Sequence, residues 1–206
     1  MFSAANIEHP NTPFLSQIPC SWGAVYFPEH WREFHEYLAI RLSGRLPELP
    51  TGQVIAPGLR SNRWTHSWKK YFIELVYLRG YMMLYPNYDD YKSLSTNHLE
   101  IGSHVKVVSR DVYERKKRLF LLPLLELPSD SQEAGNTTSL LDLPMGRVPS
   151  WPALPVTDLF GLLTTAETLK GRGNARRKEL FGCGDDDLVS SFMDMRGLLC
   201  YLDRDG

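Results

Sequence analysis

Residues 61–85, SNRWTHSWKKYFIELVYLRGYMMLY, carry the pattern that decides the fold. Their apolar side chains recur at spacings of three and four: Trp68, Tyr71, Phe72, Leu75 and Val76. This period predicts a helix that is capped by Thr65 or Ser67 and ends at Gly80. The apolar run at 81–85 then predicts a strand that is buried on both faces. A helix that leads directly into a strand indicates the α/β class.

A similar unit precedes this stretch. Residues 22–27 (WGAVYF) are aromatic and β-branched, which predicts a short strand. Pro28 suits the first position of a helix, and that helix is expected to end near Gly44. Its apolar stripe is spaced by three and four residues: Trp31, Phe34, Leu38 and Leu42. Further along, residues 110–118 predict a charged helix, and the apolar pattern of 154–163 predicts a strand.

These elements predict one α/β domain with a small mixed or mostly parallel sheet, flanking helices and an irregular C-terminal tail. Residues 1–19 contain three prolines and are expected to be an irregular lead-in. Residues 20–127 are expected to form the α/β core. Residues 128–153, rich in Ser, Asp, Gly and Pro, predict a flexible loop. The last segment, 154–206, is expected to be peripheral.

The overall composition narrows the class of function. The chain has 206 residues, of which 43% are hydrophobic, and 23 Lys and Arg stand against 24 Asp and Glu. This balance favours neither nucleic acid nor an anionic membrane as a partner. No apolar run approaches the ~20 residues of a spanning helix, and the N-terminus lacks the pattern of a signal peptide. A cytoplasmic protein is expected, or a Golgi or secretory-membrane protein if the chain is a fragment of a larger protein.

The cysteines give little further guidance. Cys20, Cys183 and Cys200 are odd in number and widely spaced, and they form no zinc-ligand motif. They are therefore expected to be buried or incidental thiols. The Asn136-Thr137-Thr138 sequon points weakly toward the secretory pathway.

The first candidate site is the polar loop that follows the predicted strand. Asn97, His98 and Glu100 offer amide, imidazole and carboxylate groups, and His104 follows four residues after Glu100. Such groups bind sugar hydroxyls, a diphosphate or a metal ion, and ligands in open α/β sheets bind beyond the carboxyl ends of strands. The alternative is a polar connector in which Asn and Ser cap a turn.

The second candidate site lies just before the predicted helix. Arg60, Arg63 and Trp64 combine cations with an indole, which suits a phosphate or the face of a sugar. Lys69 and Lys70 are better explained as a solvated helix face.

Two acidic features complete the candidates. Asp89 and Asp90 follow the predicted strand, and paired carboxylates coordinate divalent cations, although acidic pairs are also common in turns. Glu29 stands at a strand-to-helix junction, where a general base is often found, but the helix dipole alone explains a first-turn Glu. The sequence contains no GxGxxG, GxxxxGK[ST], GxSxG or HExxH motif, which argues against several common enzyme classes.

Residues 61–105, with PCSWGAVYFPEHWREFHEYLAIRL before them, resemble the conserved part of fungal glycosyltransferase family 2-like proteins. The likeness covers about residues 20–105 and extends to LPVTDLFG at 154–161. It implies the acceptor-side part of a nucleotide-sugar transferase, with Mn²⁺ or Mg²⁺ as cofactor and a nucleotide sugar and a carbohydrate or other hydroxyl acceptor as partners.

The resemblance suggests roles for the candidate residues. Glu29 and Glu100 would be catalytic, and the substrate would be bound by Arg60, Trp64, Asn97 and His98. The metal would be held by Asp89, Asp90 and His104. The donor-binding half, with its internal Asp-x-Asp, is not recognisable, which implies a truncated or inactive transferase. The alternative is a non-enzymatic interaction module, in which the aromatic residues around WKKYFIEL build a core and present a partner surface.

Overall fold

The computed structural model describes residues 7, 12–21, 24–43, 53–87, 109–118, 147, 149–183 and 195–201. The chain divides into two compact units. The first consists of Met1–Ser3, Phe14–Tyr85 and Pro155–Gly206, and the second of Ala4–Pro13 and Pro86–Leu154.

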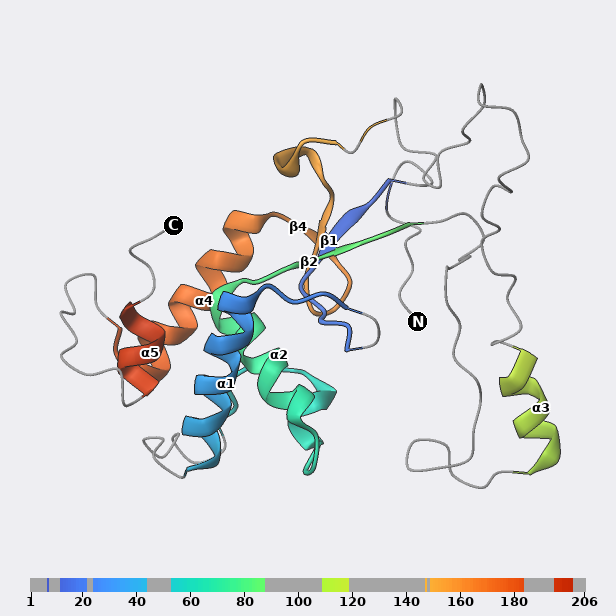
Figure 1. The fold of residues 1–206 in the computed structure, drawn as a ribbon, viewed down its shortest axis with the longest axis horizontal. Helices are drawn as coiled ribbons and strands as arrows, with labels where there is room; N and C mark the ends of the chain where they lie inside the picture. Colours follow the sequence, from blue (N-terminus) through green and yellow to red (C-terminus); the bar gives the residue numbers. More distant parts are fainter. Residues whose placement is uncertain are drawn as a thin grey trace. The chain divides into compact units, whose positions relative to one another are not determined.

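The first unit contains a four-stranded mixed sheet in the order β2-β1-β3-β4 (Figure 1). The strands are β1 (Phe14–Ser16), β2 (Met83–Tyr85), β3 (Val156–Thr157) and β4 (Leu163–Thr164). Strand β1 is antiparallel to β2 and parallel to β3, and β3 is antiparallel to β4. A small mixed sheet with helices confirms the predicted α/β class.

The N-terminal part of the prediction is corrected by β1. This strand lies within residues 1–19, which were expected to be irregular, yet it is central in the sheet. The strand predicted at 22–27 is not formed by the described residues 24–27, and Phe27 instead precedes the first residue of a helix. Only three residues of β1 pair, which is too few for an alternating pattern to stand out.

The strand predicted at 81–85 forms only over Met83–Tyr85. It lies at the edge of the sheet with β1 as its neighbour, and Leu84 is 52% exposed. The prediction of a strand buried on both faces was therefore wrong, because an apolar run of five residues does not by itself distinguish an edge strand from a central one.

Two helices lie side by side in the first unit, α1 (Pro28–Leu42) and α2 (Trp68–Arg79) (Figure 1). Both agree with their predicted spans. Pro28 occupies the first turn of α1, and Gly80 ends α2 in the left-handed conformation at φ 67°. A short 3₁₀ helix, η2 (Arg60–Arg63), precedes α2.

The C-terminal segment adds α4 (Ala166–Phe181) and α5 (Met195–Tyr201) to this unit. Thr165 caps α4 by accepting a hydrogen bond from the Thr168 N–H (3.2 Å). Leu198 and Leu199 of α5 are buried in the core. The expectation that residues 154–206 are peripheral was therefore wrong, since this segment supplies two strands, two helices and part of the core.

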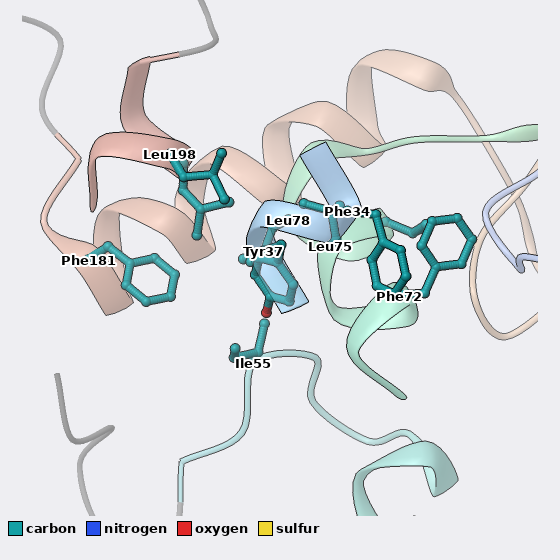
Figure 2. Close-up of a cluster of buried hydrophobic side chains, with 10 residues drawn as sticks. Phe34, Tyr37, Ile55, Phe72, Leu75, Leu78, Phe181 and Leu198 are labelled. Carbon is teal, nitrogen blue, oxygen red and sulfur yellow. The ribbon is translucent and has the colours of Figure 1, made fainter. Parts of the chain in front are cut away.

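The core lies between α1, α2, α4 and α5 (Figure 2). Its buried side chains are Phe34, Tyr37, Ile55, Phe72, Leu75, Val76, Leu78, Phe181, Leu198 and Leu199. The backbones of α2 and α4 approach closely at Gly173, where a Cβ atom would lie 2.3 Å from the Leu78 carbonyl oxygen. Glycine at this position therefore allows the two helices to cross.

A disulfide joins Cys183, just after α4, to Cys200 in α5. The expectation that these residues are thiols was wrong, because a spacing of 17 residues does not reveal which cysteines meet in the fold. Cys20 forms no disulfide.

In the second unit, the described elements are α3 (Arg110–Arg118) and the short 3₁₀ helix η5 (Trp151–Ala153). Helix α3 confirms the charged helix predicted at this position. Within the part of the chain that is described, no helix has both the length and the apolar character needed to cross a membrane.

Candidate functional site

The structure describes three of the nine predicted site residues. Six lie outside the described residues: Asp89, Asp90, Asn97, His98, Glu100 and His104. Their assignment to sugar binding, catalysis and metal binding stays a prediction. Among the described residues there is no group of three or more His, Cys, Asp and Glu side chains arranged to hold a metal ion.

The remaining three are Glu29, Arg60 and Trp64, and all are exposed. Glu29 lies in the first turn of α1, where a carboxylate complements the helix dipole. Arg60 begins η2. Trp64 ends it, and its backbone N–H donates to the Ser61 carbonyl (3.0 Å). Among the described residues, no hydrogen bond, ion pair or ring contact joins Glu29 to Arg60 or Trp64, so the structure does not bring these three together as one site.

The most distinctive surface of the first unit is formed by aromatic side chains at the start of α1 and α2. We call Trp31 and Trp68 the aromatic face, because both are exposed large apolar residues and their rings lie side by side. Trp31 and Trp68 are each 44% exposed, and their rings lie 6.4 Å apart at an interplanar angle of 84°. This places two indoles edge to face on neighbouring helices.

Buried rings hold the two indoles in place. Phe34 lies 5.4 Å from Trp31 and 5.8 Å from Trp68 between ring centroids. Phe34 in turn packs edge to face on Phe72 at 4.8 Å (Figure 2). Tyr26 contacts both Trp31 (5.4 Å) and Phe72 (5.3 Å). Such contacts stabilise a ring cluster beyond the area that it buries, so the exposed indoles rest on a fixed base.

The partial exposure of Trp68 differs from the expectation that it packs in the core, and Trp31 differs likewise from its place in the predicted apolar stripe. On α1 the buried positions are Glu33, Phe34 and Tyr37. The helix is turned so that Glu33 faces inward, and Trp31 is displaced toward solvent. A hydrophobic period cannot anticipate this rotation, because it assigns Glu33 to the outside.

Glu33 faces inward because it belongs to a buried ionic cluster, which we call the ionic core. The Nε atom of Arg79 donates to the Glu33 carboxylate at 2.6 Å, and the Tyr81 hydroxyl donates to its other oxygen at 2.5 Å. Arg79 also donates to the carbonyls of Leu198 (2.8 Å) and Leu199 (3.0 Å) in α5. Burial and then the Glu33 charge raise the pKa of Tyr81.

Arg177 of α4 completes the ionic core. This buried side chain donates to the Leu199 carbonyl at 3.2 Å and to the Asn174 amide oxygen. The last carbonyls of a helix have no partner within it, so Arg79 and Arg177 together cap α5. This cluster was not predicted from the sequence, because the hydrophobic period of α1 assigns Glu33 to the outside.

A second buried pair joins α1 to α2. Arg41 contacts both carboxylate oxygens of Glu74, at 2.8 and 3.0 Å, and the Tyr37 hydroxyl donates to Glu74 at 2.9 Å. Burial, and then the Glu74 charge, raise the pKa of Tyr37 well above its ordinary value. Because these groups satisfy one another inside the fold, they account for helix packing rather than for chemistry on a substrate.

The charges beside the aromatic face are predominantly positive. Arg60, Arg63, Lys69 and Lys70, which we call the basic rim, precede or begin α2. The first turn of α2 contains no acidic residue.

Comparison with known proteins adds one partial similarity. A family model described as "SPBC1E8.03c C-terminal domain" matches residues 2–45, a range that contains β1 and α1. That description names no activity and no ligand. No curated protein and no solved structure matches the chain.

Proposed function

We propose that this chain is a non-enzymatic interaction module and that the aromatic face is its binding surface. The observation that carries the proposal is the pair of half-exposed indoles, Trp31 and Trp68, side by side on α1 and α2. Contiguous exposed apolar surface marks interaction sites in soluble proteins. Tryptophan is also among the residues that contribute most to binding energy at protein interfaces.

The support beneath the indoles strengthens this proposal. Their helices are joined by the Arg41–Glu74 pair, and their rings rest on Phe34 and Phe72. A surface that is already ordered loses little conformational freedom when a partner binds, so more of the contact energy appears as affinity.

Sugar transfer, implied by the resemblance to glycosyltransferases, stays the alternative. Its loop residues lie outside the described part of the chain, and its described residues are Glu29 in α1 and Arg60 and Trp64 at η2, all exposed. A thermal-shift screen with nucleotide sugars and Mn²⁺ separates the two functions. A ligand at 100 times its Kd stabilises its protein by about 2.7 kcal/mol, whereas an interaction module would not respond.

Selection of peptides from a phage-displayed random library tests the proposed function on the full chain. We expect the chain to enrich peptides that bind it but bind Trp31→Ser and Trp68→Ser about 30-fold more weakly, as for loss of a hot-spot residue. Trp151→Ser is the matched control, because this exposed indole lies in η5 of the second unit. Circular dichroism of each variant verifies that it is folded. Enriched peptides that bind both tryptophan variants as tightly as the wild type would contradict the proposal.

A further inference from the structure

The basic rim is part of a longer segment without negative charge. Residues 53–73 contain four cations, Arg60, Arg63, Lys69 and Lys70, and no Asp or Glu. The whole chain has a formal net charge of −1. Positive charge is therefore gathered in the segment that contains Trp68 rather than spread evenly along the sequence.

The rim cations are not used to hold the fold together. Within the described part of the chain, no carboxylate lies in ion-pair distance of any of the four, and Lys70 instead lies over the Tyr71 ring, 5.8 Å from its centroid. By contrast, Arg41 and Arg79 are paired with buried carboxylates. The rim is thus left to interact with a partner.

Cations and indoles share the same elements. Trp68, Lys69 and Lys70 are consecutive in the first turn of α2, and η2, which contributes Arg60 and Arg63, contacts α2. The exposed charged residues of α1 include one cation, Arg32, and two carboxylates, Glu29 and Glu36. The four rim cations therefore follow Trp68 directly in α2 or lie on the 3₁₀ helix that contacts α2.

We propose that the partner that docks on the aromatic face is an acidic peptide segment of another protein, carrying aromatic or aliphatic side chains among its Asp and Glu residues. This inference rests on the proposed function. The apolar side chains of such a segment would cover Trp31 and Trp68, as the central residues of an interface do. Its carboxylates would pair with the basic rim, which speeds association and excludes basic partners.

A peptide is favoured over nucleic acid or a lipid surface by the charge of the whole molecule. The sequence pI is about 6.6, whereas nucleic-acid-binding domains are strongly basic along an extended stripe. A nucleic acid or an anionic bilayer covers a larger surface, so it would be repelled by carboxylates of the chain as well as attracted by the four rim cations. A short acidic peptide would contact the rim cations without extending to those carboxylates.

The test uses the full chain and the phage-displayed random peptide library. We expect the enriched peptides to be rich in Asp or Glu together with Trp, Phe or Leu. A synthetic copy of an enriched peptide is then titrated by calorimetry into the wild type, R60E/R63E and K116E/K117E. Lys116 and Lys117 are exposed on α3 and belong to the second unit, so this control makes the same change in net charge without altering the rim.

R60E/R63E is expected to bind the peptide about tenfold more weakly at low salt, and the difference should shrink near 1 M salt, where charges are screened beyond ~3 Å. K116E/K117E should bind as the wild type does. A peptide with Lys in place of its acidic residues should prefer R60E/R63E to the wild type, which a merely damaged variant would not show.

The outcomes separate the two proposals. Enriched peptides that depend on Trp31 and Trp68 but are not acidic, or that bind R60E/R63E unchanged, would overturn the acidic partner and leave the interaction module standing. If none of the enriched peptides depends on the indoles for binding, both proposals are overturned. Indole-dependent binding to a dT20 oligonucleotide or to phosphatidylserine vesicles, stronger than to any enriched peptide, would also overturn the acidic peptide.

Discussion

Two residues of the ionic core, Glu33 and Arg79, lie on the same two helices as the aromatic face, and together they invert the usual distribution of side chains. On α1, Glu33 is 7% exposed, whereas Trp31, two residues earlier, is 44% exposed. On α2, Arg79 is 9% exposed and Trp68 is 44% exposed. The buried charges have partners inside the fold, and the indoles have only part of their surface covered. Position on these helices therefore follows the available partners more than hydrophobicity.

This contrast assigns different roles to the two regions. Removing one partner of a buried ion pair leaves an uncompensated charge and destabilises a protein strongly. Truncating a half-exposed ring loses less buried area. We therefore expect mutations in the ionic core to act on folding and mutations in the aromatic face to act mainly on binding.

The largest effect is expected for Arg79→Met. Glu33 would remain buried without its cation, and the Leu198 and Leu199 carbonyls would lose their donors. The free energy of unfolding should fall by about 3–5 kcal/mol, measured by urea denaturation. Glu33→Met combined with Arg79→Met should recover part of this loss, because no charge of the pair remains. A loss from Arg79→Met no larger than that from Trp68→Ser would break the contrast between the two regions.

The disulfide tests whether α5 is held by charge alone. Replacing Cys183 and Cys200 with Ser should lower the free energy of unfolding by about 3 kcal/mol, the value expected for a loop of roughly 15 residues. Reductant should lower the Tm of the wild type and leave that of the double variant unchanged. Cys20→Ser is the control, since Cys20 forms no disulfide. If reductant leaves the Tm of the wild type unchanged, the ionic core suffices to hold α5.

Helices α1, α2 and α3 were predictable because their signals are local, whereas α4 (Ala166–Phe181) was not predicted. Pro28 and Gly80 mark a helix start and a helix end, and the charged run at 110–118 forms α3. The sheet was not predictable from the sequence. Strands β1 and β3 contain three and two residues, and they pair across a sequence separation of about 140 residues. No local pattern records such a pairing.

For the candidate site, the helices that hold Trp31 and Trp68 were predicted from the sequence, but the exposure of these two side chains was not. Trp31 and Trp68 were recognised as members of apolar helix faces, whereas each is 44% exposed. The ion pair that buries Glu33 joins residues 46 apart in the sequence, which no local pattern records. Arg60 and Trp64 proved to be exposed, and their predicted role in sugar binding stays a prediction.

The crossing of α2 and α4 determines whether Arg177 reaches α5, so it offers a smaller test of the ionic core. Gly173→Ala would place a methyl group 2.3 Å from the Leu78 oxygen, and overpacking of this kind costs about 1–3 kcal/mol. Gly171→Ala is the matched control on the same helix, because nothing lies within 4 Å of its added Cβ. It should instead stabilise the protein by up to ~1 kcal/mol. Thermal denaturation of both variants gives the comparison, and equal effects would show that the helices do not cross here.

The smallest expected effect concerns Tyr37, whose ring lies in the core while its hydroxyl donates to Glu74. Its pKa is raised, by burial first and then by the Glu74 charge. The folded state therefore keeps the phenol proton at a pH where the unfolded chain, with a Tyr pKa of about 10, releases it. The stability that this proton contributes is complete below pH ~10 and is lost as the pH rises further, by at most ~1.4 kcal/mol per pH unit.

Tyr37→Phe removes this titration while Arg41 still pairs with Glu74. At pH 7 the variant should lose about 1 kcal/mol with its hydrogen bond, and above pH ~10 its stability should fall less steeply than that of the wild type. Short thermal scans between about pH 8 and pH 11 measure the two slopes around the unfolded-state pKa. Trp31→Ser should keep the wild-type slope, because an indole side chain does not titrate and Tyr37 is retained. Parallel slopes for the wild type and Tyr37→Phe would mean that the Tyr37 proton does not contribute, and the coupling of this ring to the buried charges would be refuted.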